Sequence, residues 1–544
     1  MLSMIPRVSM KRPSILKVPQ GQMVLKNVRL LMFALAIFFF GWALRNVFST
    51  EITFNDQARH AMNGVALLDI VRDGEIQHPA SYLRRYFARL PALSMPYHPP
   101  LFPAVEAIFY AVFGVNPFAP RLAVALCVFG SVLFLFGIVH RIHGSATLAA
   151  SVVVVFFSLP LSQQLAADVM LEMPALLPAL AAFWYMISLK DSSWEQRDAV
   201  LAGTFAAVAV WTKQVLFIGL IPLFLIAVGR RWKLLYSRSV WLFLLIYGGS
   251  VLALAALWAK AGLAGLSKGW APTGMLNRLA QNSLFYASTV PRPLSMILLV
   301  VVAGLCALLF VTELRPVLGK ALRLYVCWIL ACALVLLAVP AFDVRYFWFL
   351  YPALLAILFS ASQIVAERFL RPSHVRWAIL VAAAGLCLAN LRHPAPRLTG
   401  PRSAAQYVLK AGAERVLYCG GANGSFIFAV RSIDPSRAMA VLRADKIAST
   451  LRDESVDGFT ARYGIRFVVV ERNRVSNCED FLARSESLGA PEQVIPLSSS
   501  ERAFEGSIQI LRQTKAFSNS PTVIEMPFTS TGESFALETG RNPW

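Results

Sequence analysis

Several ionisable side chains in this sequence stand beside long apolar segments. Charged groups are costly near a bilayer, so a set of them gathered there is a functional hypothesis by default. Carboxylates in such a set can take a proton from a hydroxyl group, and cations can stabilise negative charge that develops during a reaction. The residues concerned are Asp56, His98, Asp168, Glu172, Lys213, Asp343 and Arg345.

These residues also have purely structural interpretations. Asp56 precedes a predicted helix over Gln57–Val71 and could simply complement the helix dipole. His98 stands before two prolines and could end an extended turn. Asp168 and Glu172 flank a predicted helix start, where acidic residues are expected for capping. Taken one by one, these residues do not identify a site.

The two cations near apolar runs have structural alternatives as well. Lys213 could extend its ammonium toward lipid headgroups, and Arg345 could pair with Asp343. These residues can share a role only if the segments that carry them bring them to one face of a membrane.

The composition places the chain in a bilayer. Hydrophobic residues make up 57 % and charged residues 15 % of its 544 residues, and the mean hydropathy is +0.59. A water-soluble globule needs far less apolar surface. Long apolar stretches recur from Leu30 to Leu391 and then stop. The net charge of +21 does not indicate nucleic-acid binding, because many Lys and Arg residues flank apolar runs, where membrane orientation and anionic lipids explain them.

The positions of the basic residues predict the topology. Residues 1–29 form a basic cytoplasmic tail, and the apolar run after it reads as an anchor rather than a cleavable signal peptide. The next basic segment beside apolar runs is His140–His143. Residues 49–118 therefore form an external loop, in which the apolar segment 101–115 is too short to cross and should lie in the interface.

The following runs keep the acidic residues outside. The run near 147–161 crosses outward and the run near 173–189 returns, so Asp168 and Glu172 face the outer side. The segment 198–230 has cytoplasmic ends, which predicts a hairpin of two short helices. The turn of this hairpin brings Lys213 toward the outer face.

Further apolar runs are expected near 239–259, 294–312, 323–340, 346–365 and 376–391. About eleven spans result, and Asp343 and Arg345 also face outside. The predicted external loop 260–292 carries several basic residues, which is contrary to the positive-inside rule. These cations could instead bind an anionic ligand. Residues 30–392 are thus predicted to form a polytopic α-helical membrane domain.

Residues 393–544 have an ordinary soluble composition and should lie on the non-cytoplasmic side. A helical stretch at Ser403–Lys410 precedes strand-like runs at Arg415–Cys419, Ile465–Val470 and Ile508–Leu511, which suggests a small α/β domain. Gly420–Gly424 lacks the spacing of a dinucleotide fingerprint and is interpreted as a turn. Cys419 and Cys478 are the only cysteines here, and a disulfide between them is compatible with the sequence, although no spacing argument predicts it.

Short motifs in a fixed order connect these separate signals. Over residues 30–391 they resemble the GT-C glycosyltransferases related to lipid A aminoarabinose transferases and protein O-mannosyltransferases. Asp56–Ala61 resembles the family's Asp-Glu-Ala-Arg-Tyr-Ala element, and His98–Leu101 resembles its Lys/His-Pro-Pro-Leu turn. The other matching segments are Phe113–Asn116, Ala119–Leu122, Asp168–Leu171, Leu201–Lys213 and Arg345-Tyr346 with Pro352.

The resemblance implies a membrane enzyme that moves a sugar from a polyprenyl-phosphate carrier to a lipid, glycan or protein acceptor. The reaction would occur at the non-cytoplasmic face, most simply of a bacterial inner or plasma membrane, and direct displacement would invert the anomeric centre. Asp56 would be the catalytic base and Asp168 a second acidic participant. Lys213 and Arg345 would bind the donor phosphate. Further substrate-binding candidates are His98, Glu172, Asp343 and Tyr346.

The sequence departs from the family pattern at two places. Gln57 replaces an acidic residue, and His98 stands where Lys is frequent in the aminoarabinose branch. The donor sugar therefore stays open. His98 could orient the donor or ligate a divalent metal ion with nearby carboxylates, but no ligand spacing identifies a metal site.

Two other functions would also use charged groups near a membrane. One is a flippase or transporter of polyprenyl-phosphate-linked lipids, in which such groups mark a permeation route. Transporters more often show paired repeats or broken helices in both halves, and neither is clear in this sequence. The other is a non-catalytic envelope assembly protein that presents its C-terminal domain outside.

Overall fold

The structure, a computed structural model, describes most of the chain. Its described residues are 22–213, 236–260, 343–392, 396–445 and 455–513, with short gaps, a few helical residues between 277 and 332, and strands 523–527 and 534–538.

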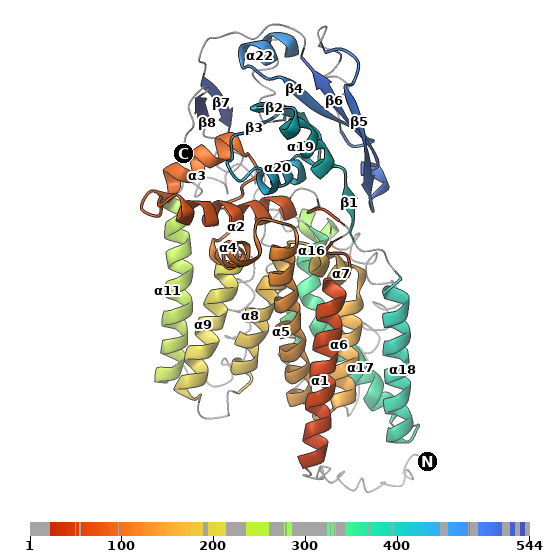
Figure 1. Cartoon of the computed structure of the whole chain (residues 1–544). Coiled ribbons are helices and arrows are strands. Elements are labelled where there is room, and N and C mark those ends of the chain that lie inside the picture. The colour runs from red at the N-terminus through yellow and green to blue at the C-terminus, as the bar shows by residue number, and fades with distance from the viewer. Residues whose placement is uncertain are drawn as a thin grey trace, which may run out of the picture.

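A bundle of long helices forms one end of the molecule (Figure 1). Its members run side by side and are rich in apolar residues, as a bilayer requires. They are α1 (Gln22–Ala43), α5 (Phe118–His143), α6 (Ala146–Ser158), α8 (Glu172–Met186), α9 (Gln196–Thr212), α11 (Arg238–Lys260), α17 (Tyr351–Ala366) and α18 (Pro372–Asn390).

The prediction of a polytopic helical membrane protein is confirmed in this coarse form. Among the described residues, 4 helices are long and apolar enough to cross a membrane, or up to 5 if a bent pair counts as one span. The bent pair is α6 with α7 (Pro160–Ala167), which meet at 68° where Pro160 begins the second helix. The predicted run near 294–312 lies outside the described residues, so the number of about eleven spans stays a prediction.

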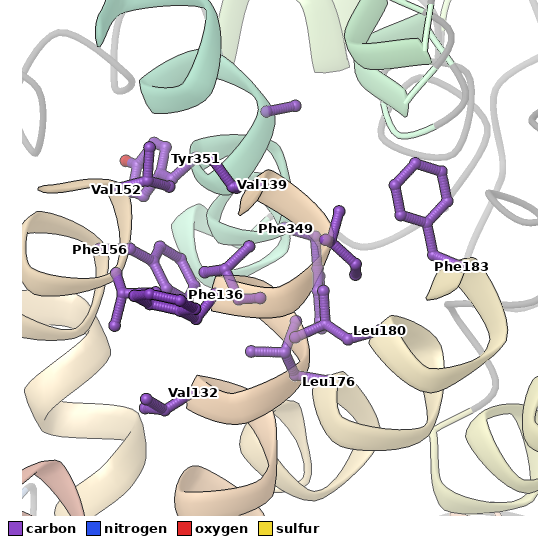
Figure 2. Close-up of a cluster of buried hydrophobic side chains, with 14 of the residues drawn as sticks. Val132, Phe136, Val139, Val152, Phe156, Leu176, Leu180, Phe183, Phe349 and Tyr351 are labelled. Atoms are coloured by element: carbon purple, nitrogen blue, oxygen red, sulfur yellow. The ribbon is translucent and has the colours of Figure 1, made fainter. Parts of the chain in front are cut away.

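Aromatic and aliphatic side chains from α5, α6, α8 and the α17 region form the centre of the bundle. Figure 2 shows Phe136, Phe156, Leu176 and Phe349 among the side chains gathered between these helices. All four are buried. Burial of such large side chains stabilises the packing of these helices against one another.

Three helices of residues 49–118, the segment predicted to be an external loop, lie across the end of the bundle that is nearest the sheet (Figure 1). They are α2 (Asp56–Arg72), α3 (Pro79–Arg89) and α4 (Leu101–Phe113). The predicted helix that follows Asp56 is present. The short apolar segment runs crosswise to the bundle as α4, and Gly64 allows it to approach α2, because a Cβ there would lie 2.6 Å from that of Glu106.

A mixed sheet lies above this layer, with strand order β1-β5-β6-β4-β2-β3. β2 (Arg415–Cys419) pairs in parallel with β3 (Ala440–Arg443) and β4 (Phe467–Arg472), whereas the remaining pairings are antiparallel. The other strands are β1 (Leu398–Thr399), β5 (Gln493–Ser499) and β6 (Gly506–Arg512), and the helices are α19 (Pro401–Lys410), α20 (Asn423–Ile433) and α22 (Val456–Arg462). The strands predicted near 415–419, 465–470 and 508–511 and the helix near 403–410 are all present.

The glycine-rich segment after β2 is a closed turn rather than a nucleotide site. The buried carboxylate of Glu471 accepts hydrogen bonds from the amides of Gly421 at 3.1 Å and Ala422 at 2.6 Å. Gly420 is required here, because a Cβ would lie 2.3 Å from the carboxyl carbon of Glu471. An internal carboxylate thus occupies the amides that a phosphate would need.

The sheet domain and the helices α2 and α3 share one hydrophobic core. Apolar side chains of α2 and α3, such as Val65 and Tyr86, are buried in the same cluster as Phe426 and Val430 of α20. α18 ends at Asn390 and β1 begins at Leu398, on either side of the boundary predicted near residue 393. The sheet is therefore packed onto the loop rather than appended to the membrane bundle.

Candidate active site

Asp56 and Arg345 form the centre of a charged cluster at the end of the bundle that is nearest the sheet. Asp56 is the first residue of α2, and Arg345 lies in the short helix α16 (Val344–Phe347). Arg345 Nη2 donates to Asp56 Oδ2 at 2.8 Å. Arg345 Nε lies 2.7 Å from Asp343 Oδ2 and 3.6 Å from Glu172 Oε1. One guanidinium therefore joins three carboxylates that come from distant parts of the chain.

Lys213 belongs to the same cluster. It follows the last residue of α9, and its ammonium donates to Glu172 Oε1 at the start of α8. The Lys213 Nζ atom lies 5.3 Å from the centre of the Tyr346 ring, within range of a cation–π contact. Only 5 % of the Lys213 side chain is exposed, so this lysine does not extend into lipid headgroups. Residues 214–235, the second half of the predicted hairpin, lie outside the described residues.

The exposure of the carboxylates separates their roles. The Asp56 side chain is 30 % exposed, whereas that of Glu172 is 0 % exposed. A solute can therefore reach Asp56, whereas it cannot reach Glu172 without a rearrangement. Asp343 is also accessible, but its Oδ1 atom caps α16 by accepting from the Arg345 amide at 3.0 Å. Asp56 is thus both accessible and directly bonded to Arg345.

Asp168 is buried and its carboxylate is already engaged. Oδ2 accepts from the amide of Thr53 at 3.0 Å and from the hydroxyl of the same residue. Oδ1 accepts from the Val169 amide at 2.9 Å and lies 3.5 Å from the guanidinium of Arg121. These contacts hold the chain just before Asp56. We therefore infer a positioning role for Asp168, which differs from the direct acidic role that the family resemblance implied.

The charges of the cluster are balanced within the protein. Asp56, Glu172 and Asp343 carry the negative charges, and Lys213, Arg345 and Arg59 carry the positive ones, the last with its guanidinium 3.7 Å from Asp56. Carboxylate and phosphate are recognised by the same ammonium and guanidinium groups. The acidic residues therefore satisfy the cations, which are the kind of groups that a phosphate would also use.

The pKa of Asp56 reflects these neighbours. Burial alone would raise this pKa, but the Arg345 guanidinium, which donates to the carboxylate, and the guanidinium of Arg59 outweigh burial and hold the pKa well below its ordinary value. A carboxylate with a low pKa is a weak base. Asp56 therefore becomes a better base when Arg345 turns to another anion.

His60 is a site residue that the sequence reasoning missed. It lies one helical turn after Asp56, and its ring centre is 4.7 Å from that of His98. The Nδ1 atoms of both histidines are buried and have no hydrogen-bond partner among the described residues. The spacing of four residues on a predicted helix was a usable signal, because such residues share one helix face.

Burial keeps both imidazoles neutral. It lowers the pKa of His98 to about 4, and the ammonium of Lys213 acts in the same direction. Burial and the neighbouring His98 hold the pKa of His60 well below its ordinary range. Among the described residues, no group of three or more His, Cys, Asp and Glu side chains is arranged to hold a metal ion. The neutral rings are suited to hydrogen bonds with uncharged groups such as sugar hydroxyls.

These histidines predict a pH dependence of stability. Their folded-state pKa lies below the unfolded value, so stability is full above pH 6.5 and should fall as the pH is lowered toward 4, when the unfolded chain takes up protons that the folded pair excludes. The apparent Tm of purified His98→Gln should fall less over this interval than that of the wild type. His78→Gln, which alters an exposed histidine, is the control. Equal pH profiles for all three proteins would contradict the prediction.

A known family matches the part of the chain that carries much of this cluster. The family described as dolichyl-phosphate-mannose-protein mannosyltransferase matches residues 97–258. The matched segment contains His98, Glu172 and Lys213. No curated protein matches the sequence.

Two solved structures share the fold. ArnT from Cupriavidus metallidurans in the apo state has 15 % sequence identity and a TM-score of 0.55, with 90 % of this chain and 98 % of that chain covered. ArnT from the same organism bound to undecaprenyl phosphate has 15 % identity and a TM-score of 0.52, with 91 % and 100 % covered. At this identity the likeness establishes a common fold. Together with the family match, it confirms the resemblance to the GT-C glycosyltransferases.

Proposed function

We propose that this GT-C-like membrane protein transfers a sugar from a polyprenyl-phosphate carrier to a hydroxyl group of a lipid, glycan or protein acceptor. The observation that carries the proposal is the Arg345 guanidinium, which joins the accessible carboxylate of Asp56 to the buried Glu172–Lys213 pair. In this proposal the cluster supplies a base, Asp56, and two cations for the donor phosphate, Arg345 and Lys213. The matching family and the undecaprenyl phosphate bound to ArnT agree with such a donor.

The donor phosphate would compete with the protein's own carboxylates. Arg345 offers a planar fork that can hold two phosphate oxygens, and Lys213 offers a compact charge held over Tyr346. As the phosphate attracts Arg345, its bond to Asp56 weakens and the pKa of Asp56 rises toward its ordinary value. Donor binding thus makes Asp56 a stronger base.

The proposed reaction is a direct displacement at the anomeric carbon. The acceptor hydroxyl oxygen forms a bond to this carbon while the bond from the carbon to the phosphate oxygen breaks. The proton of the hydroxyl passes to Asp56, and the electron pair of the broken bond remains on the polyprenyl phosphate, where Arg345 and Lys213 stabilise it. A single displacement inverts the anomeric configuration. The neutral rings of His60 and His98 would orient the sugar by hydrogen bonds to its hydroxyl groups.

The disulfide supports a non-cytoplasmic location for the sheet and the cluster. Cys419 and Cys478 are joined in the structure. Disulfides persist mainly in oxidising compartments outside the cytoplasm. Since the sheet packs on α2, which carries Asp56, both would lie on the same side of the membrane.

The transporter alternative is not favoured. The family that matches residues 97–258 consists of transferases, and the fold is that of ArnT. A transporter would need no base beside its phosphate-binding cations, whereas Asp56 is accessible and directly bonded to Arg345.

The proposed function can be tested by comparing membranes with and without the protein. Mass spectrometry of lipids, glycans and proteins from both should reveal one glycosylated product that depends on this chain. The same sugar should then accumulate on polyprenyl phosphate when the chain is absent. Identical product and carrier profiles in the two membranes would count against the transferase function.

A further inference from the structure

We infer that the C-terminal sheet domain is a clamp that positions α2, and that Arg431 is a positioning residue for Asp56. This inference rests on the proposed function, because Asp56 is assigned there as the base. The clamp is defined as the contacts that Arg431, Arg437 and residues 398–425 make with residues 50–73. It gives the C-terminal domain a role in the reaction without any catalytic group of its own.

The first contact is a buried ion pair at the far end of α2. Arg431 of α20 donates from Nε to Asp69 Oδ2 at 2.8 Å and from Nη2 to Asp69 Oδ1 at 2.6 Å. The side chains are 4 % and 1 % exposed. Tyr86 of α3 donates its hydroxyl to the same carboxylate at 3.0 Å. This bidentate, fully bonded geometry fixes both the distance and the rotation of α2 against α20.

A second ion pair continues the same contact at the surface. Arg437 Nη1 and Nη2 donate to the two oxygens of Asp73 at 2.6 and 2.9 Å. Tyr82 of α3 donates to Asp73 and accepts from Arg437 at 3.0 Å. The end of α2 and the start of α3 are therefore tied to the segment between α20 and β3.

The chain before α2 is held by the same domain. The carboxylate of Glu51 accepts from the amides of Gly400 at 2.9 Å and Arg402 at 2.7 Å, at the start of α19. The Glu51 amide donates to the Leu398 carbonyl at 2.9 Å. Ser425 of α20 donates to the carbonyl of Thr53, three residues before Asp56, at 3.2 Å.

The membrane bundle holds this segment from the other side. Arg121 of α5 donates to the carbonyls of Thr50 at 2.9 Å and Glu51 at 2.6 Å, and Asp168 binds Thr53 as described above. α2 is thus fixed at both ends by the sheet domain, and its start is fixed by the bundle that carries Arg345. The distance between Asp56 and Arg345 depends on all of these contacts together. Removing one partner of a buried pair leaves an uncompensated charge, so the clamp should loosen when Arg431 is neutralised.

Arg431→Gln tests this inference in the full-length protein. We expect kcat to fall by about tenfold or more while the Kd for undecaprenyl phosphate changes less than twofold, since a displaced base slows proton removal without removing the phosphate-binding cations. Hydrogen exchange of the α2 amides, residues 56–72, should become faster than in the wild type. Arg431→Lys keeps the charge but not the fork, so it should restore part of the rate.

Arg512→Gln is the matched control. Arg512 pairs with Glu492 at 3.1 Å inside the sheet domain. Among the described residues, no ion pair or hydrogen bond joins it to α2. Its loss should leave both kcat and exchange over α2 at the wild-type level. The clamp is refuted if Arg431→Gln and Arg512→Gln have equal rates, or if α2 exchange does not change in Arg431→Gln. If the wild type itself neither binds undecaprenyl phosphate nor transfers sugar, the proposed function fails, whereas the exchange measurement still decides whether the sheet domain fixes α2.

Discussion

Asp56→Asn is expected to abolish sugar transfer, with a loss of about 10²–10⁴-fold in kcat. The amide keeps the shape of the side chain but cannot accept the proton of an acceptor hydroxyl. Asp56 also neutralises Arg345 across a 2.8 Å bond. Its replacement therefore leaves Arg345 with more positive charge for the donor, and Asp56→Asn should bind undecaprenyl phosphate at least as tightly as the wild type. Transfer rate and phosphate binding, measured on the same purified protein, give the two readouts.

Glu75→Gln is a suitable control for this variant. Glu75 lies between α2 and α3 in the same external loop and pairs with Arg85 at 3.3 Å, outside the Asp56 cluster. It should transfer at the wild-type rate. Full turnover by Asp56→Asn would exclude Asp56 as the base, and a loss of phosphate binding without a loss of kcat would make it a donor-binding residue instead.

The local elements of this protein could be predicted from sequence, because each is encoded in a short segment. The helix that begins at Asp56 follows from an acidic first turn, and the strand Arg415–Cys419 follows from its buried apolar run. The end of a helix at Lys213 was expected from the basic residues that flank residues 198–230. The ordered motifs were sufficient to identify the GT-C fold.

The pairings within the site could not be predicted in the same way. Asp56 and Arg345 are separated by 289 positions, and their bond depends on how α16 meets the outer end of the bundle. The topology placed Asp168 and Glu172 on the same face, but it could not show that one holds Thr53 whereas the other binds Lys213. Asp168 and Glu172 lie only four positions apart at the start of a helix, and the direction of each side chain decides which partner it binds.

The contacts of the C-terminal region with α2 could not be predicted from the sequence, for a related reason. Arg431 and Asp69 lie 362 positions apart, and neither belongs to a recognisable motif. The composition after residue 392 indicates a soluble fold, but not which surface it covers. Only the packing of α20 on α2 shows that a separate part of the sequence holds the helix that carries Asp56.

Lys213→Ala is expected to weaken the binding of undecaprenyl phosphate and to slow transfer by about 10²–10³-fold, because both the bound and the departing phosphate lose a cation. Lys213→Arg should recover only part of the activity, since its fork is bulkier than the compact ammonium over Tyr346. Transfer should be measured against donor concentration for each variant, after folding has been verified. A purely structural lysine would instead change stability without changing the dependence on donor concentration.

One further variant separates the loss of a phosphate ligand from the exposure of a buried charge. In Lys213→Ala, Glu172 loses its nearest cation and keeps the more distant Arg345, 3.6 Å away, so it could draw this guanidinium away from the donor. The double variant Lys213→Ala/Glu172→Gln removes both charges of the pair. If Lys213 binds phosphate, the double variant should fold as well as the wild type but remain slow and weak in donor binding. Recovery of wild-type kinetics in the double variant would mean that Lys213 serves only to neutralise Glu172, and Arg345 would then be the principal phosphate ligand.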